Sequence, residues 1–296
     1  MQRLGKFTYS RPESLQQTLD ILRKEGDTAC ILAGGTDLLV AMKEKGLNPS
    51  ALVDIKGLTE MAGIRGGDDG WLEIGALTTL HAIETHPGLQ QKYPGVVEAA
   101  TGIGSLQVRN RATIGGNLCN AAPSADMAPV LIAYQAMVRM VGPAGERSIA
   151  LEEFFTAPGR TVLASGEVVA ALLLPPQTGS AAGAYLKHGP RRAMDIAVAG
   201  VGVCLDLNPQ GMCQEARIVL GAVAPTPLRA KQAEQVLIGK QLDETLIAAA
   251  ADMAGAEARP ISDIRASAEY RREMVVVLTR RAVAAALARI DRGVKE

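Results

Sequence analysis

The 296-residue sequence has few aromatic residues: one Trp, three Phe and five Tyr, against 31 glycines. A core with so few large rings has to be built from small aliphatic side chains, so we expect closely packed helices and strands. Hydrophobic residues make up 48% of the chain. This share, in a chain of this length, predicts a sizeable core and two or three domains.

The sequence has no close pair of cysteines. Cys30, Cys119, Cys204 and Cys213 are far apart, and the three histidines, His81, His86 and His188, do not have the spacing of metal ligands. Zinc and iron–sulfur sites usually carry close cysteine pairs, so we expect neither a metal site nor a disulfide framework in this chain.

An excess of charge and long apolar runs are also missing. The 31 basic and 31 acidic residues give a formal net charge of zero, which argues against a nucleic acid or an anionic membrane surface as partner. No run reaches the ~18 apolar residues of a membrane span, and residues 1–10 contain no apolar signal segment. We therefore expect a cytoplasmic protein.

The usual catalytic motifs are absent. The sequence contains no G-x-S-x-G, no G-x-x-x-x-G-K-[ST] and no G-x-G-x-x-G, so no catalytic residue is predicted. A chain that binds a ligand but has no acid–base pair or nucleophile fits a cofactor that performs the chemistry itself.

Two glycine pairs point to such a ligand. Residues 33–37 read Ala-Gly-Gly-Thr-Asp between an apolar run and a helical pattern, and residues 113–126 read Thr-Ile-Gly-Gly-Asn-Leu-Cys-Asn-Ala-Ala-Pro-Ser-Ala-Asp. Glycine permits positive φ and lets a bulky group approach the main chain. With short polar side chains and the N–H groups of Gly115 and Gly116, both stretches suit phosphate oxygens and ribose hydroxyls. One such pair is more often an ordinary turn, but two together favour a binding site.

The periodicity predicts an α+β chain in three parts. In the first two, strands are expected at 29–32, 51–55, 61–65, 71–75, 136–141, 146–150 and 168–174, and helices at 12–25, 38–45, 79–85, 88–100 and 129–134. After Pro175-Pro176, strands are expected at 184–188, 196–207 and 216–223, then helices at 228–238, 243–257 and 268–290. Strands followed by helices indicate helices laid on one face of an antiparallel sheet.

The glycine stretches, with Arg109-Asn110 before the second and the segments 123–126, 156–159 and 224–227, resemble the FAD-binding medium subunit of the molybdenum hydroxylases, of the xanthine dehydrogenase and carbon monoxide dehydrogenase type. The resemblance covers nearly the whole chain. It implies a two-lobed FAD-binding domain of the vanillyl-alcohol oxidase/MurB-like (PCMH) type over residues 1–176, with lobes of about 1–66 and 71–176. A C-terminal domain like that of the CO dehydrogenase flavoprotein, with a sheet and three helices, would cover 177–296.

The resemblance also implies the cofactor contacts. The backbone of residues 32–37 and 113–117 would hold the FAD pyrophosphate, and the side chains of Asn117 and Asp126 would contact the cofactor. Ile103, Cys119 and Val169 would lie at the flavin, and Lys187 of the second domain would reach the cofactor. The residues concerned are Leu32, Ala33, Gly34, Gly35, Thr36, Asp37, Ile103, Thr113, Gly115, Gly116, Asn117, Cys119, Asp126, Val169 and Lys187. A cation at Lys187 would stabilise the anionic reduced flavin. Because neither glycine stretch contains histidine, we expect FAD to be bound non-covalently.

Several residues have alternative interpretations. Cys119 could be a reactive or flavin-linked thiol, although a small hydrophobe is favoured. Without the resemblance, Lys187 would be interpreted as a solvated residue at the end of a strand. Arg109 and Arg111 fit equally well as phosphate ligands or as anchors of the loop. The segment 188–195, with Arg191 and Arg192, could dock a nicotinamide acceptor or form a charged surface turn.

The resemblance implies an oxidoreductase subunit that transfers electrons. A molybdopterin-binding large subunit would oxidise the substrate, [2Fe–2S] clusters on a small subunit would carry the electrons, and FAD here would pass them to NAD or another acceptor, within a heterotrimer. Two alternatives remain at this stage: a self-sufficient FAD-dependent oxidoreductase of the PCMH fold, and a scaffold that has lost FAD.

Overall fold

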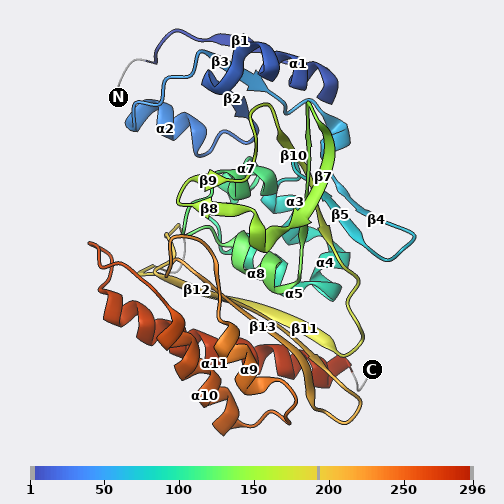
Figure 1. Cartoon of the computed structure of the whole chain (residues 1–296), viewed down its shortest axis with the longest axis vertical. Coiled ribbons are helices and arrows are strands. Elements are labelled where there is room, and N and C mark those ends of the chain that lie inside the picture. Colours follow the sequence, from blue (N-terminus) through green and yellow to red (C-terminus); the bar gives the residue numbers. More distant parts are fainter. Residues whose placement is uncertain (1–3, 192–193, 294–296) are drawn as a thin grey trace.

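The computed structural model describes residues 4–191 and 194–293. They form three layers from the N-terminus to the C-terminus (Figure 1). We call these the N-terminal lobe, the middle lobe and the C-terminal unit. The expected α+β class is confirmed, because each of the three contains a sheet with helices packed beside it.

The N-terminal lobe is a parallel sheet in the order β1-β3-β2, made of Thr8–Ser10, Ala51–Asp54 and Ala29–Leu32. Helices α1 (Leu15–Glu25) and α2 (Leu38–Glu44) pack beside it. Ser14 Oγ caps α1 by accepting from the Gln17 N–H, and Gly26 ends the helix at φ +64°. The strand expected at 61–65 in this lobe is wrong, because β4 (Ile64–Gly66) joins the next sheet and the third strand is β1.

The middle lobe is built on an antiparallel sheet in the order β4-β5-β10-β6-β7. Its other strands are β5 (Leu72–Gly75), β10 (Val168–Leu174), β6 (Met137–Gly142) and β7 (Gly145–Ala150). Six of the seven β10 residues are buried, so both faces of this central strand are covered. A short hairpin, β8 (Phe155–Ala157) and β9 (Arg160–Thr161), lies outside the sheet.

Six short helices cover the middle sheet. They are α3 (Leu80–Thr85), α4 (Pro87–Lys92), α5 (Pro94–Thr101), α6 (Leu106–Arg109), α7 (Ile114–Cys119) and α8 (Met127–Ala133). The prediction of a single helix over 88–100 is wrong, because Pro94 cannot continue α4 and begins a new helix, α5. The cap of α3 is Thr79, and the hydroxyl of the preceding Thr78 donates to the Gly63 carbonyl.

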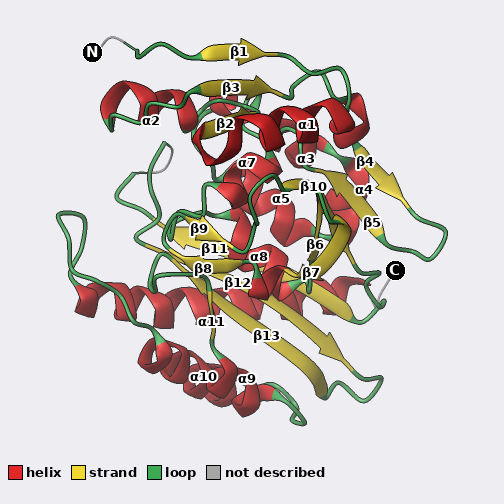
Figure 2. Ribbon diagram, turned by 45° about the horizontal axis from the view of Figure 1, so that its top comes forward, coloured by secondary structure: helices red, strands yellow, loops and turns green. Residues whose placement is uncertain are grey.

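The C-terminal unit is a four-stranded antiparallel sheet in chain order. Its strands are β11 (Ala181–His188), β12 (Ala199–Leu207), β13 (Cys213–Gly221) and β14 (Leu228–Arg229). Three helices lie on one face of this sheet (Figure 2): α9 (Lys231–Leu237), α10 (Glu244–Glu257) and α11 (Ala268–Gly293). A Cβ on Gly255 of α10 would lie 2.6 Å from Val276 Cγ2 of α11. Glycine therefore allows these helices to approach closely, as the scarcity of aromatic residues predicts.

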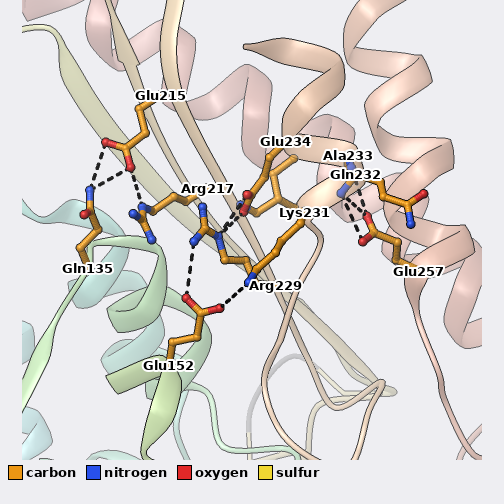
Figure 3. Close-up of polar contacts among 11 residues, drawn as sticks. Gln135, Glu152, Glu215, Arg217, Arg229, Lys231, Gln232, Ala233, Glu234 and Glu257 are labelled. Atoms are coloured by element: carbon orange, nitrogen blue, oxygen red, sulfur yellow. Dashed lines mark hydrogen bonds and ion pairs between the residues drawn. The ribbon is translucent and has the colours of Figure 1, made fainter. Parts of the chain in front are cut away.

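The other face of this sheet packs on the middle lobe. A Cβ on Gly202 of β12 would lie 2.8 Å from the Pro129 backbone of α8, so the strand and the helix touch at main-chain distance. Polar contacts add to this interface at its edge (Figure 3). There Arg229 lies 3.5 Å from Glu152 and 2.8 Å from Glu234, and Gln135 donates to Glu215 at 3.0 Å. Apolar packing holds the two units together, because ion pairs near the surface contribute little.

No helix within 4–191 or 194–293 is long and apolar enough to cross a bilayer. In the same ranges, no three His, Cys, Asp or Glu side chains are grouped as metal ligands would be.

Candidate functional site

A cavity of about 1050 Å³ lies between the N-terminal and middle lobes. This volume is at the upper end of the ~300–1,000 Å³ typical of ligand pockets, so the cavity can take a large cofactor. Thirteen of the fifteen predicted site residues line it: Ala33, Gly34, Gly35, Thr36, Asp37, Ile103, Thr113, Gly115, Gly116, Asn117, Cys119, Asp126 and Val169. Leu32 is the buried last residue of β2, and Lys187 contacts Asp126 behind the cavity wall. Residues about 80 positions apart in the chain thus meet at one site.

The first glycine stretch is a tight turn between β2 and α2. Gly35 has φ +77°, the left-handed conformation that glycine adopts without strain. A Cβ on Gly34 would lie 2.2 Å from the Arg111 carbonyl oxygen, so this turn packs on the backbone that leads to the second stretch. Within the described chain, the N–H groups of residues 34–37 have no hydrogen-bond acceptor. They are four consecutive donors beside the cavity, available to an anion.

The second glycine stretch is a helix, not the loop expected from its sequence. Thr113 is the N-cap of α7, and neither Gly115 nor Gly116 has positive φ. The N–H groups expected to be free are used inside the chain: Gly115 donates to the Ala76 carbonyl at 2.9 Å, and Gly116 donates to Thr113 Oγ1 at 3.1 Å. These two donors are therefore unavailable to a phosphate.

The two glycines of α7 have different surroundings. A Cβ on Gly115 would lie 2.8 Å from the Ala76 carbonyl oxygen, so Gly115 permits close packing of the helix on the protein. For Gly116, the nearest described atom outside its own helix backbone is Thr113 Oγ1 at 3.0 Å, with no other within 4 Å. Gly116 thus leaves open the side of the helix that a ligand would approach.

Asn117 has the clearest unmet hydrogen-bonding capacity in the cavity. Its Oδ1 atom is buried and has no hydrogen-bond partner within the described chain. A buried carbonyl oxygen without a donor costs about 1–3 kcal/mol. A ligand hydroxyl or ring N–H in the cavity would satisfy it.

Asp126 brings a carboxylate to the cavity and is 7% exposed. Its Oδ1 accepts from the Tyr185 hydroxyl at 2.7 Å, and its Oδ2 accepts from Lys187 Nζ at 2.9 Å. Burial raises the pKa of Asp126 above its ordinary value, while Lys187 and Tyr185 act to lower it. Lys187 Nζ also donates to the carbonyls of Gly102 and Asp195, at 2.7 and 3.3 Å, so its three donors all have acceptors in the chain.

Arg109 anchors the segment that carries Ile103. Its Nε and Nη2 donate to the two carboxylate oxygens of Glu84 at 2.8 and 3.2 Å, and its Nη1 donates to the Ile103 carbonyl at 3.2 Å. The paired guanidinium lowers the pKa of Glu84. Of the two interpretations of Arg109, the geometry supports the anchor. Arg111 is exposed, and its carbonyl is the group that lies against Gly34.

The Cys119 side chain is accessible from the cavity, but the surrounding protein raises the pKa of its thiol to about 12. The cause is poor hydration of the sulfur among the protein atoms packed around it, and no cation lowers the pKa. The group is therefore a neutral thiol at physiological pH, which agrees with the interpretation as a small apolar side chain.

The segment after β11 lies at the cavity mouth, where Met194, Asp195 and Ile196 line it. Asp195 Oδ2 accepts from the Arg191 N–H at 2.7 Å, which stabilises the turn. Arg192, the other arginine considered for acceptor binding, lies outside the described residues. Docking of an acceptor here stays a prediction.

The turn at 163–167 also lines the cavity, and sequence reasoning missed it. Ser165 Oγ donates to Asp27 Oδ1 at 2.6 Å, which joins the middle lobe to the N-terminal lobe at the cavity rim. The only sequence signal was the turn-forming pair Ser165-Gly166 before β10.

Comparison with known proteins identifies similar chains along nearly the whole length. The model of the FAD binding domain in molybdopterin dehydrogenase matches residues 5–177, and that of the CO dehydrogenase flavoprotein C-terminal domain matches residues 184–286. The carbon monoxide dehydrogenase medium chain of Afipia carboxidovorans is 38% identical, over 96% of this chain and 98% of the relative. The xanthine dehydrogenase FAD-binding subunit of Escherichia coli O157:H7 is 34% identical, over 95% and 96%.

Solved structures show the same fold. A chain of carbon monoxide dehydrogenase from Hydrogenophaga pseudoflava superposes with a TM-score of 0.93 at 35% identity, over 97% of this chain and 99% of that one. A chain of quinoline 2-oxidoreductase from Pseudomonas putida 86 gives a TM-score of 0.90 at 29% identity, over 97% and 99%.

Proposed function

This chain belongs to the family of FAD-binding medium subunits of the molybdenum hydroxylases, and we propose that it transfers electrons between a partner's [2Fe–2S] clusters and NAD or another acceptor. It is an oxidoreductase subunit with an FAD-binding domain. The electron path and the acceptor are our proposal.

The residues of the cavity fit FAD. Four consecutive backbone N–H donors at 34–37 can hold the pyrophosphate, and the unpaired Asn117 Oδ1 can accept from a ribose hydroxyl or from the ring. Gly116 leaves room for the cofactor along α7. The single observation that carries the assignment is this combination of unpaired donors and an unpaired buried acceptor around one cavity.

The predicted contacts of Leu32, Thr36, Ile103, Cys119 and Val169 belong to the same proposal. Ile103 and Val169 would supply apolar contacts to the ring, and the neutral Cys119 thiol would pack without forming a covalent link. FAD would then be held non-covalently.

When bound, FAD supplies the ability to exchange electrons singly on one side and in pairs on the other. The chain's own residues bind and orient the cofactor and set the charge around it. Lys187 and Asp126 place a cation and a carboxylate next to one another at the wall. Because the Lys187 donors are all engaged within the chain, its effect on the ring would be chiefly electrostatic.

The proposal includes the partners: a molybdopterin-binding large subunit and a [2Fe–2S] small subunit, in a heterotrimer in the cytoplasm. The similar chain from Afipia carboxidovorans is named a medium chain, which supports this assembly. We also propose that the chain divides at 176/177, with an FAD-binding domain of two lobes, about 1–66 and 71–176, before the C-terminal domain; the two matched family models meet close to this point.

The test is to purify the tagged chain from its own cell with whatever binds it, and to measure FAD, molybdenum and iron per chain. We expect about one FAD, one molybdenum and four irons, the content of one molybdenum centre and two [2Fe–2S] clusters. A chain that carries FAD but purifies alone and oxidises its own substrate would instead establish the self-sufficient oxidoreductase.

A further inference from the structure

Tyr185 and Lys187 stand two residues apart on β11, so their side chains point to the same face of the sheet. Both reach Asp126 of the middle lobe, one at each carboxylate oxygen. Of these three residues only Asp126 lines the cavity. The carboxylate is therefore held from behind by the C-terminal unit while it faces the cofactor site.

The fold makes room for the Tyr185 hydroxyl. A Cβ on Gly200, which pairs with Lys187 on the neighbouring strand, would lie 2.6 Å from Tyr185 Oη. The Tyr185 side chain is 4% exposed, and its hydroxyl donates its single hydrogen to Asp126. A phenylalanine at 185 would fill the same space apart from that one oxygen.

Without the hydroxyl, Oδ1 of Asp126 would be a buried carboxylate oxygen without a donor. Lys187 and Tyr185, both on β11, are the charged or titratable side chains that the structure places against Asp126; Asp195 contributes only its backbone carbonyl to the same lysine. Burial favours the neutral acid and these two side chains favour the charged form. Loss of one of the two shifts this balance toward the neutral acid.

We propose that Tyr185 is a positioning residue that acts through Asp126: its hydroxyl holds the carboxylate in the cavity wall and favours the charged form, and it thereby tunes the reduction potential of the flavin. The inference rests on the proposed function, because it requires FAD in this cavity. An anionic carboxylate beside the flavin opposes the negative charge gained on reduction. Neutralising Asp126 should therefore make the potential more positive.

The experiment compares the FAD-loaded wild type with Tyr185→Phe and with Tyr93→Phe as the matched control. Tyr93 is as buried as Tyr185, but its hydroxyl donates to the Pro175 carbonyl at 2.7 Å and not to Asp126. The midpoint potential of the bound flavin is measured from pH 5 to pH 9 in all three proteins and in Asp126→Asn.

Titration of Asp126 should produce a bend in the plot of midpoint potential against pH. In Tyr185→Phe we expect this bend at a pH about one unit higher, because Asp126 loses one hydrogen bond that stabilises its charged form. Tyr93→Phe should follow the wild type, and Asp126→Asn should lack the bend. If the Tyr185→Phe curve coincides with that of Tyr93→Phe, the proposal is overturned. If Tyr185→Phe does not fold, Gly200→Ala, which displaces the same hydroxyl, should move the bend in the same direction.

A second measurement keeps this inference separate from the proposed function. In the FAD-free chain, urea unfolding between pH 4 and pH 8 reports the charge of Asp126. Its folded pKa is raised, so the stability from its bound proton is complete below the unfolded value and is lost as pH rises through the folded value.

In Tyr185→Phe this loss should extend to a pH about one unit higher, and the difference should vanish in the Asp126→Asn background. No such difference would overturn the role of Tyr185 even if FAD binds well. A wild type that takes up no FAD, with the difference still present, would leave Tyr185 a positioning residue for Asp126 and would refute only the proposed cofactor.

Discussion

Gly34→Ala tests the close contact between the turn that follows β2 and the segment that leads to α7. The added Cβ would lie 2.2 Å from the Arg111 carbonyl oxygen and 2.9 Å from Ala112 Cα. Both are backbone atoms that cannot rotate away, so the turn and the segment before α7 must move apart. Overpacking of this kind costs about 1–3 kcal/mol, and contact with backbone favours the upper part of that range.

Gly116→Ala tests whether FAD lies along the open side of α7. In a helix, alanine is more stable than glycine by up to about 1 kcal/mol, and the tight contact with Thr113 Oγ1 at 3.0 Å offsets part of this gain. We expect the unfolding free energy to change by less than about 1 kcal/mol in either direction. The methyl group would occupy cavity space along α7, so FAD affinity should fall at least about tenfold.

The assay is urea unfolding of the FAD-free chain together with an FAD titration followed by flavin fluorescence. Gly66→Ala is the matched control, because a Cβ there meets no described atom within 4 Å. If Gly34→Ala has the same free energy of unfolding as Gly66→Ala, the backbone does not approach Gly34 as closely as described. Gly116→Ala with wild-type affinity would show that FAD does not lie along this side of α7.

Three further predictions concern two residues of the cavity lining and the Glu84–Arg109 pair that anchors Ile103. Glu84→Gln leaves the partly buried Arg109 without its carboxylate and should lower the free energy of unfolding by about 1–2 kcal/mol. Because Arg109 lowers the pKa of Glu84 in the folded chain, urea unfolding should show the full difference between wild type and variant above pH 4.5. The difference should disappear as the pH falls through the folded pKa of Glu84. Asn117→Ala removes the unpaired Oδ1, so FAD affinity should fall about tenfold in the titration while the FAD-free chain loses little stability; a large loss of stability with unchanged affinity would contradict this role. Cys119, whose thiol has a pKa of about 12, should react slowly with iodoacetamide at pH 8, and rapid alkylation would contradict the neutral thiol. Cys119→Ala should retain its flavin during gel filtration at neutral pH, because the thiol forms no covalent link to it.

Short apolar runs made parts of the fold predictable from sequence. Strands β2 and β10 occur at the expected residues, because each is a run of apolar residues bounded by turn signals. Strand β1 was missed because its three residues, Thr8–Ser10, are polar or exposed and form a strand only by pairing with β3. The break between α4 and α5 was visible in Pro94 and was not used.

The site could be predicted in position but not in conformation. The two glycine stretches do line one cavity, as their shared chemistry indicated. Gly115 donates its N–H to the Ala76 carbonyl, which lies some 40 residues away in the chain and comes close only through the fold. The cavity rim at Ser165 depends in the same way on Asp27.

The proposed function requires that this cavity holds FAD, and we propose that no covalent bond attaches it. The most direct test is the visible absorbance spectrum of the purified chain before and after acid precipitation. We predict flavin bands that pass into the supernatant on precipitation, in a ratio of about one FAD per chain. A colourless chain that takes up no added FAD would contradict the account, and bands that stay with the precipitate would contradict non-covalent binding.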